Sequence, residues 1–120
     1  MNASGDNSAR IINLMQFARK AGKLVSGADA CIRALHGKGL HLIVIAGDTT
    51  ARTVKRIENA TAESSGRVPT LRISTQQELS AALGLPLTGI FGIQDRQFAA
   101  RMMEYHTAQQ SGGMSANTRT

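Results

Sequence analysis

The apolar run HLIVIA, at residues 41–46, constrains the fold of this chain more than any other part of the sequence. Its β-branched residues favour a strand, and the lack of polar alternation is typical of a strand that is buried on both faces. A run of this length is too short to cross a lipid bilayer. It therefore predicts a central strand whose two faces are covered by other elements of the domain.

Helical and extended patterns alternate along the rest of the chain. Spacing typical of helices occurs at residues 11–21, 30–35, 54–65, 79–83 and 98–103, and extended patterns occur at 24–25, 41–46, 70–73 and 87–93. This order predicts an α/β fold, a three-layer α-β-α sandwich with a mixed central sheet of about four strands. We expect one domain at residues 10–107, with disordered tails at 1–9 and 108–120.

Residues that favour helix ends mark the boundaries between these elements. The predicted start signals are Ser26 with Asp29, Asp48 or Thr49, Thr75 with Glu78, and Asp95, and the predicted stop signals are Gly22, Gly37, Gly39, Gly66 and Gly84. Pro69 suits the first position of the strand that follows it.

The cysteine content and the N-terminal segment predict a cytoplasmic protein. Cys31 is the only cysteine, so no intrachain disulfide is possible, which fits a reducing intracellular compartment. The segment MNASGDNSAR is polar and lacks the apolar region of a secretory signal. Because Cys31 lies in a helical apolar pattern, we expect it to be a buried core residue.

The positive charge is concentrated in the first half of the chain, whose formal net charge as a whole is +6. Between residues 10 and 56 the cations are Arg10, Arg19, Lys20, Lys23, Arg33, Lys38, Arg52, Lys55 and Arg56, and the acids are Asp29 and Asp48. This asymmetry predicts one basic face and a polyanionic partner. Nucleic acid is favoured over a membrane because no basic amphipathic helix with large apolar anchors is present.

Aromatic residues are scarce, with three Phe and one Tyr. This argues against modules that bind RNA mainly by stacking bases on aromatic side chains.

The segment RKAGKLVSGADACIRAL, residues 19–35, carries the strongest signal for a binding site. Gly27 and Ala28 leave the first turn of the predicted second helix bare, so that its free N–H groups can face an anion. Four cations, Arg19, Lys20, Lys23 and Arg33, are expected to surround this turn. Two interpretations stay open: a phosphate-binding turn, or an ordinary capped helix with a solvated basic face.

Further candidate residues follow the central strand. Arg52, Lys55 and Arg56 cluster on one side of the predicted third helix, either as phosphate contacts or as a solvated face. The hydroxyls of Thr49 and Thr50 suit either phosphate binding or helix capping, and capping is the favoured interpretation.

Signals for catalysis and for cofactors are weak. His36, His41 and His106 lack the spacing of metal ligands, so no metal site or cofactor is predicted. No phosphate-binding glycine loop, dinucleotide motif or nucleophile elbow occurs, so we do not expect an enzyme.

Several phrases, in their order and spacing, resemble the kink-turn-binding ribosomal protein superfamily of the L-seven-Ae / L-thirty-e type, and especially its bacterial YlxQ-like branch. The phrases are AGKLVSG at 21–27, LIVIAGDTT at 42–50, VP at 68–69, ELSAALG at 78–84 and IQDRQFA at 93–99. The resemblance covers residues 10–105. It implies an RNA-binding α/β/α sandwich that is monomeric when free.

In that superfamily the start of the second helix carries a glycine, an Asn, a Glu and a Lys that read sheared G·A pairs in an RNA kink. The resemblance places the glycine at Gly27, the Asn position at Asp29, the Glu position at Ala30 and the Lys position at Arg33. A side chain of Ala cannot accept from a guanine edge, and Asp only accepts where Asn also donates. Because each lost bidentate contact removes about 1–3 kcal/mol of discrimination, we expect weak or altered kink-turn specificity.

The resemblance extends to neighbouring loops. An acidic position of the family corresponds to Thr50, a lysine position to Gln76, and an apolar loop to Leu85, Pro86 and Leu87. The complete set of residues predicted to contact RNA is Arg19, Lys20, Lys23, Ser26, Gly27, Ala28, Asp29, Ala30, Arg33, Asp48, Thr49, Thr50, Arg52, Lys55, Arg56, Gln76, Leu85, Pro86 and Leu87.

The predicted function is therefore that of a ribosomal-type or ribosome-associated protein. It would bind structured RNA, either ribosomal RNA or another kink-turn-like RNA, through a basic face at the start of the second helix. The alternative is a protein-interaction scaffold of the same fold without specific RNA binding.

Overall fold

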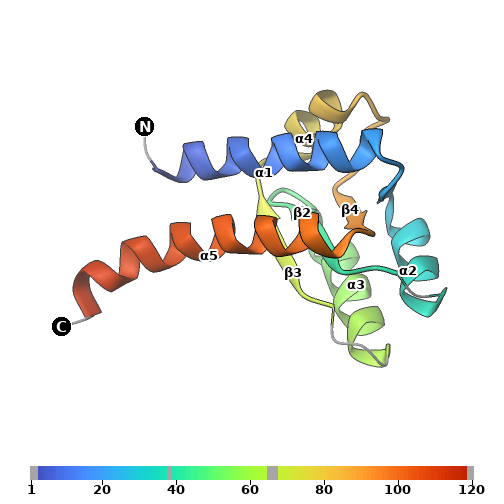
Figure 1. The fold of residues 1–120 in the computed structure, drawn as a ribbon. Coiled ribbons are helices and arrows are strands. Elements are labelled where there is room, and N and C mark those ends of the chain that lie inside the picture. Colours follow the sequence, from blue (N-terminus) through green and yellow to red (C-terminus); the bar gives the residue numbers. More distant parts are fainter. Residues whose placement is uncertain (1–2, 38, 65–67, 119–120) are drawn as a thin grey trace.

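The computed structural model describes residues 3–37, 39–64 and 68–118 as nine elements in alternating order (Figure 1). The helices are α1 (Ala3–Lys20), α2 (Ala28–Gly37), α3 (Ala51–Glu63), α4 (Gln76–Leu83) and α5 (Arg96–Thr118), and the strands are β1 (Leu24–Ser26), β2 (Leu42–Ala46), β3 (Thr70–Ile73) and β4 (Ile90–Ile93). This order confirms the predicted α/β class. Within the described part of the chain, no helix is long and apolar enough to span a membrane.

The four strands form one mixed sheet in the order β1-β4-β2-β3. Strands β2 and β3 are parallel, and β4 lies antiparallel to both β1 and β2. Strands β1, β2 and β3 therefore run in the same direction, and only β4 runs against them. The edge at which β1, β2 and β3 end is called the C-terminal edge below.

The central strand separates two hydrophobic cores, as its lack of polar alternation predicts. Leu42, Val44 and Ala46 pack on one face with residues of α1, α4 and α5. Ile43 and Ile45 pack on the other face with residues of α2 and α3. Because side chains of a strand alternate between faces, β2 needs apolar residues at every position, and all five are buried. The predicted three-layer sandwich is confirmed.

Several predicted helix ends are confirmed. Gly22 has φ 74, and the amide of Lys23 donates to the carbonyl of Ala18 at 2.8 Å, the pattern in which a glycine ends a helix. Gly84, with φ 67, ends α4 in the same way. Asp95 accepts from the amide of Phe98 at 2.9 Å and so caps α5.

Other predicted boundaries are corrected by the structure. Thr50 caps α3 by accepting from the amide of Thr53 at 3.3 Å, so neither Asp48 nor Thr49 is the cap. Thr75 accepts from the amide of Glu78 at 3.1 Å, but the Glu78 carboxylate accepts from Ser74 and does not complete a capping box. Gly66 lies outside the described residues.

The last strand is shorter than predicted, since β4 begins at Ile90 and residues 87–89 form a loop. The buried side chain of Ser80 holds this loop: its hydroxyl donates to the carbonyl of Thr88 at 3.1 Å and accepts from the amide of Thr88 at 3.0 Å. These bonds use the backbone groups that a longer strand would need.

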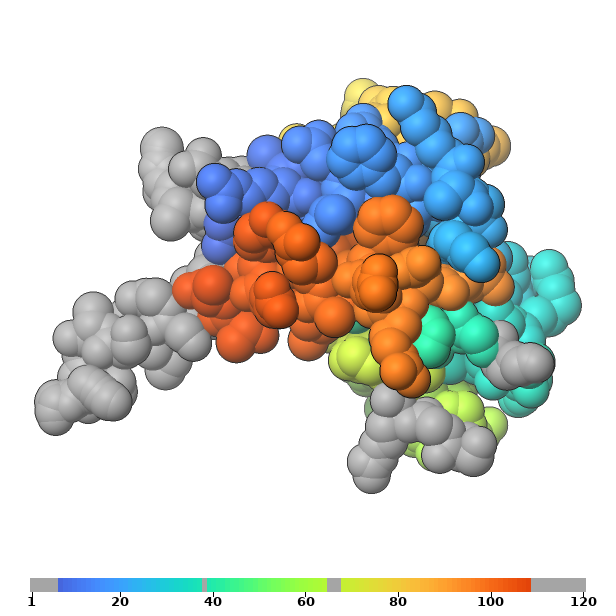
Figure 2. All heavy atoms as spheres, viewed as in Figure 1, coloured from blue at the N-terminus to red at the C-terminus, as the bar shows by residue number. Residues whose placement is uncertain are grey.

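Helix α1 begins at Ala3 and α5 continues to Thr118, so helix extends into both segments predicted as disordered tails. The two helices pack against each other, and Figure 2 shows their surfaces in contact. The side-chain amide of Asn7 donates to the carbonyl of Tyr105 at 3.0 Å, and the guanidinium of Arg10 lies 5.5 Å from the centre of the Tyr105 ring. These contacts join residues that are far apart in the sequence, so local sequence patterns cannot predict them.

Candidate functional site

Strand direction brings the beginnings of three helices to the C-terminal edge of the sheet. Helices α2, α3 and α4 follow β1, β2 and β3, and these strands all end at this edge. The segment 84–89 enters the antiparallel strand β4 at the same edge. Polar and charged residues at the ends of parallel strands commonly form binding sites, so this edge is the candidate site.

Gly27 sets the conformation of the α2 start. Its φ is 95, its amide donates to the carbonyl of Ile90 at 2.8 Å, and its carbonyl accepts from the amide of Cys31 at 3.0 Å. Gly27 is therefore the N-cap residue, and the predicted N-cap Ser26 is instead the last residue of β1. No atom lies within 4 Å of a Cβ built on Gly27, so the space in front of this turn is open.

Asp29, in the first turn of α2, forms an ion pair with Arg56 of α3. Arg56 donates to the Asp29 carboxylate and thereby lowers the pKa of Asp29 below its ordinary value, with Arg33 adding a smaller effect in the same direction. Asp29 therefore does not complete a capping box with Ser26. The pair partly neutralises the acid that would otherwise repel an anion at this turn.

Asp48 links the β2–α3 loop to the start of α4. Its carboxylate accepts from the backbone amide of Gln76 at 2.8 Å, and the side-chain amide of Gln76 donates to the carbonyl of Asp48 at 3.3 Å. Asp48 thus holds the first residue of α4, where a carboxylate is favoured by the helix dipole. Both residues belong to the set predicted to contact RNA, but their contact with each other was not predicted.

Thr49 and Gly89 bring the β2–α3 loop and the α4–β4 loop into contact at this edge. The hydroxyl of Thr49 donates to the carbonyl of Gly89 at 3.4 Å, and a Cβ built on Gly89 would lie 2.2 Å from that hydroxyl oxygen. Gly89 lies within residues 87–93, which the extended pattern predicted only as a strand. Its absence of a side chain is what allows the two loops to meet, so it is a site residue that sequence reasoning missed.

Leu87 projects from the loop between α4 and β4 and is 69% exposed. Leu85 is half-buried against the core, and Pro86 is exposed. The predicted apolar loop therefore presents Leu87 and Pro86 to solvent beside Gly89.

The cations on α2 and α3 are accessible at or near this edge. Arg33, Arg52, Lys55 and Arg56 are all exposed. Among the residues that the structure describes, Arg33, Arg52 and Lys55 have no ion-pair partner, whereas Arg56 is paired with Asp29. Three cations are therefore available for an anionic ligand.

Lys23 lies at the other end of β1 from the α2 start, which corrects the prediction that it surrounds this turn. The carbonyl of Lys23 accepts from the amide of Gln94 at 2.8 Å, whereas Gly27 bonds to Ile90. These contacts lie at opposite ends of the β1–β4 pair, separated by the length of the strand. Arg19 and Lys20 are exposed in the last turn of α1, before Lys23 in the chain.

The other predicted residues at the beginning of α2 have small, uncharged side chains. Ser26, Ala28 and Ala30 are half-buried at the beginning of α2, and Ala30 contributes no hydrogen-bonding side chain. No group of three or more potential metal ligands occurs in the described ranges. The edge thus offers open backbone at the α2 start, exposed cations and short polar side chains, a combination that suits phosphate groups.

Comparison with known proteins supports the resemblance found in the sequence. The RNA-binding protein YlxQ of Enterococcus faecium is 28% identical over 98 residues, which cover 82% of this chain and 92% of that protein. A protein of unknown function from Bacillus halodurans superposes with a TM-score of 0.74 at 20% identity, covering 81% of this chain and 96% of the other. The Giardia lamblia 15.5kD RNA binding protein superposes with a TM-score of 0.72 at 18% identity, covering 87% and 90%.

A model of the family described as ribosomal protein L7Ae/L30e/S12e/Gadd45 matches residues 9–102. This span includes all nine elements, with α1 and α5 in part. The chain therefore belongs to the ribosomal protein L7Ae/L30e/S12e/Gadd45 family.

Proposed function

We propose that this protein binds structured RNA through its C-terminal edge. The observation that carries the proposal is the meeting of three helix starts with the exposed cations Arg33, Arg52 and Lys55. Free N–H groups at a helix start and nearby cations both favour phosphate. The names of two similar proteins, which describe them as RNA-binding, support the same function.

Phosphate contacts rather than base contacts dominate this binding in our proposal. Ala30 offers no acceptor for a base edge, the carboxylate of Asp29 is engaged by Arg56, and Gln76 is engaged by Asp48. Phosphate contacts position a protein on RNA without reading its sequence. We therefore propose a weak preference for kink-turns, with ribosomal RNA or another folded RNA as the partner and no catalytic role.

Binding to two matched RNAs across a salt series tests the proposal. One RNA is a standard kink-turn, and the other is a duplex of equal length in which the sheared G·A pairs are replaced by Watson–Crick pairs. We expect similar affinity for both and a steep loss of affinity as salt rises, because phosphate neutralisation releases counterions. Strong preference for the kink-turn would contradict the proposed loss of base reading. Absence of binding to either RNA would overturn the function and favour a protein-interaction scaffold.

Charge removal locates the interface. Substituting Arg33, Arg52 and Lys55 together by Gln should lower the steepness of the salt dependence by about one unit for each lost phosphate contact. The matched control is Arg96→Gln, which removes an exposed cation at the start of α5, at the opposite edge of the sheet. An effect per removed charge that is equal in the triple variant and in Arg96→Gln would show that the interface lies at another face.

A further inference from the structure

Phe17 is a large apolar side chain of α1 that lies outside the hydrophobic core. Ile11, Met15 and Ala18 are completely buried, and they mark the face of α1 that packs on the sheet. Phe17 lies on another face and is 57% exposed. Phe17 lies within residues 11–21, whose spacing predicts a helix, and its exposure is a finding of the structure.

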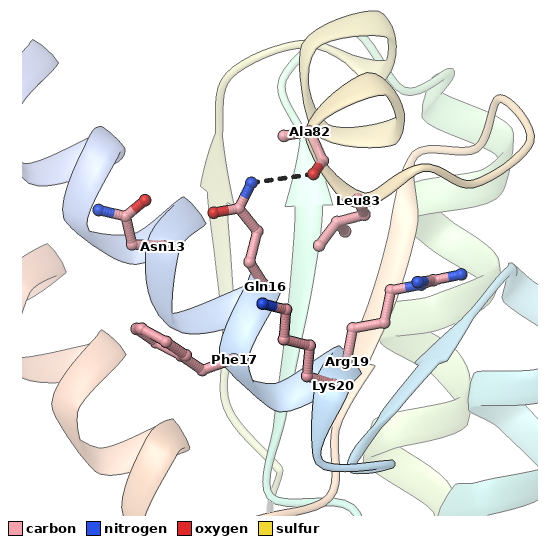
Figure 3. Close-up of a pocket in the computed structure, with 7 residues that line it drawn as sticks. All are labelled: Asn13, Gln16, Phe17, Arg19, Lys20, Ala82 and Leu83. Atoms are coloured by element: carbon pink, nitrogen blue, oxygen red, sulfur yellow. Dashed lines mark hydrogen bonds between the residues drawn. The ribbon is translucent and has the colours of Figure 1, made fainter.

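A cavity of about 500 Å³ lies beside Phe17, between α1 and α4 (Figure 3). Asn13, Gln16, Phe17 and Lys20 of α1 line it at helical spacing, so they share one face of the helix. Ala82 and Leu83 of α4 form the apolar part of the lining. This volume falls in the range of sites that hold small organic ligands.

Gln16 is held in a defined orientation at this cavity. Its side-chain nitrogen donates to the carbonyl of Ala82 at 2.9 Å, one of the last carbonyls of α4, which lack partners within the helix. The side-chain oxygen of Gln16 points away from this bond (Figure 3) and stays available as an acceptor. The α4 end of the cavity therefore favours N–H donors over an anion.

Two cations from the last turn of α1 also line the cavity. Arg19 and Lys20 line it and are exposed, whereas no Asp or Glu is among its lining residues. In the part of the chain that the structure describes, neither cation has an ion-pair partner. The cavity thus combines an aromatic face, a fixed acceptor and two free cations.

We propose that this cavity holds one unpaired nucleotide of a single-stranded RNA segment. The base stacks on the ring of Phe17 and donates an N–H to the side-chain oxygen of Gln16, while Arg19 and Lys20 bind the adjoining phosphates. Stacking on aromatic residues and cationic contacts to the backbone are the two components of single-strand binding. The inference rests on the proposed RNA-binding function, and it adds a second contact, away from the α2 start.

The test uses the full chain and two probes, the single-stranded RNA pentamer UUUUU and a pentamer with the same sugar-phosphate backbone but no bases. The wild-type protein should bind UUUUU at least about fivefold more tightly, the lower end of the effect of one stacked base. Phe17→Leu should reduce this difference, because Leu keeps an apolar side chain without an aromatic face, while the Gln16 oxygen stays in place. Substituting Arg19 and Lys20 by Gln should weaken binding of both probes, and Arg96→Gln should change neither.

Ring signals of the three phenylalanines provide a direct readout in the protein labelled at Phe. The signal that is missing from the NMR spectrum of Phe17→Leu belongs to Phe17. Addition of UUUUU should shift this signal and leave the signals of the other two phenylalanines unchanged. Phe17 is exposed, so Phe17→Leu is expected to keep the thermal unfolding midpoint of the wild type. Equal affinity for the two pentamers, or an undiminished difference in Phe17→Leu, would overturn the inference.

Measurement of structured-RNA binding on the same samples separates the two proposals. In one outcome, both structured RNAs bind in a way that depends on Arg33, Arg52 and Lys55, but the affinity difference between the two pentamers is the same in wild type and Phe17→Leu. Only the cavity inference then fails. If neither structured RNA nor either pentamer binds, the proposed function itself fails, and the inference fails with it.

Discussion

Arg56 of α3 donates a hydrogen bond to the carboxylate of Asp29 in the first turn of α2. The two residues are 27 positions apart in the sequence. Their pairing offsets the negative charge of Asp29 at the open end of α2. Without Arg56, an unpaired carboxylate would stand where the free N–H groups of the helix face solvent. With it, the turn keeps a binding surface to which the exposed Arg33 adds positive charge.

The first prediction concerns the pH dependence of this pair. Because Arg56 lowers the pKa of Asp29, we expect its carboxylate to titrate below the range of an ordinary aspartate, whose pKa is about 3.9. The pair's contribution to stability should be fully present above that value and be lost as pH falls through the lowered pKa of the folded state. NMR titration of the Asp29 side-chain carbonyl measures the shift.

Arg56→Gln is the matched variant for this titration, and it should return the pKa of Asp29 toward the ordinary value. Since both side chains are more than half exposed, the midpoint of thermal unfolding should change little. An Asp29 titration that is the same in both proteins would show that the pair is not maintained in solution.

The second prediction tests which residue caps α3. Thr50→Ala removes the acceptor for the amide of Thr53 and should lower the free energy of unfolding by about 1 kcal/mol. Chemical denaturation followed by circular dichroism measures the change. The control Thr50→Ser keeps the hydroxyl, so it should retain most of the stability.

The third prediction concerns the approach of Gly89 to Thr49. Gly89→Ala would place a methyl group 2.2 Å from the Thr49 hydroxyl oxygen, so the two loops must move apart, at a cost of about 1–3 kcal/mol. Thr49→Ala removes that oxygen and should restore part of the stability in the double variant. A double-mutant cycle of unfolding free energies measures this coupling, and strictly additive effects would contradict the close contact.

The fourth prediction concerns the thiol of Cys31. Burial raises the pKa of Cys31 to about 12, so the unfolded chain releases this proton at lower pH than the native protein. Stability should therefore fall as pH rises above roughly 8.5, by up to about 1.4 kcal/mol per pH unit from this group. Urea unfolding of the wild type and of Cys31→Ala at several alkaline pH values isolates the effect. Parallel pH dependences in the two proteins would show that the thiol does not contribute.

The sequence alone determined the order of the elements, the doubly buried central strand and the helix ends at Gly22, Gly84 and Asp95. Each of these depends on neighbours within a few positions: a left-handed glycine, a capping carboxylate, or the apolar content of five consecutive residues. Local chemistry of this kind acts in the same way wherever the element lies in the fold. The family resemblance likewise depends on the order of short phrases along the chain.

Only the tertiary structure decided which residues share a surface. Asp29 meets Arg56, Asp48 meets Gln76 at a separation of 28 positions, and Thr49 meets Gly89 at a separation of 40. These contacts depend on strand order and direction. The same geometry separates Lys23 from Gly27, because β1 lies between them and they bond to opposite ends of β4. Residues that are close in the sequence lie at different edges of the sheet when a strand runs between them.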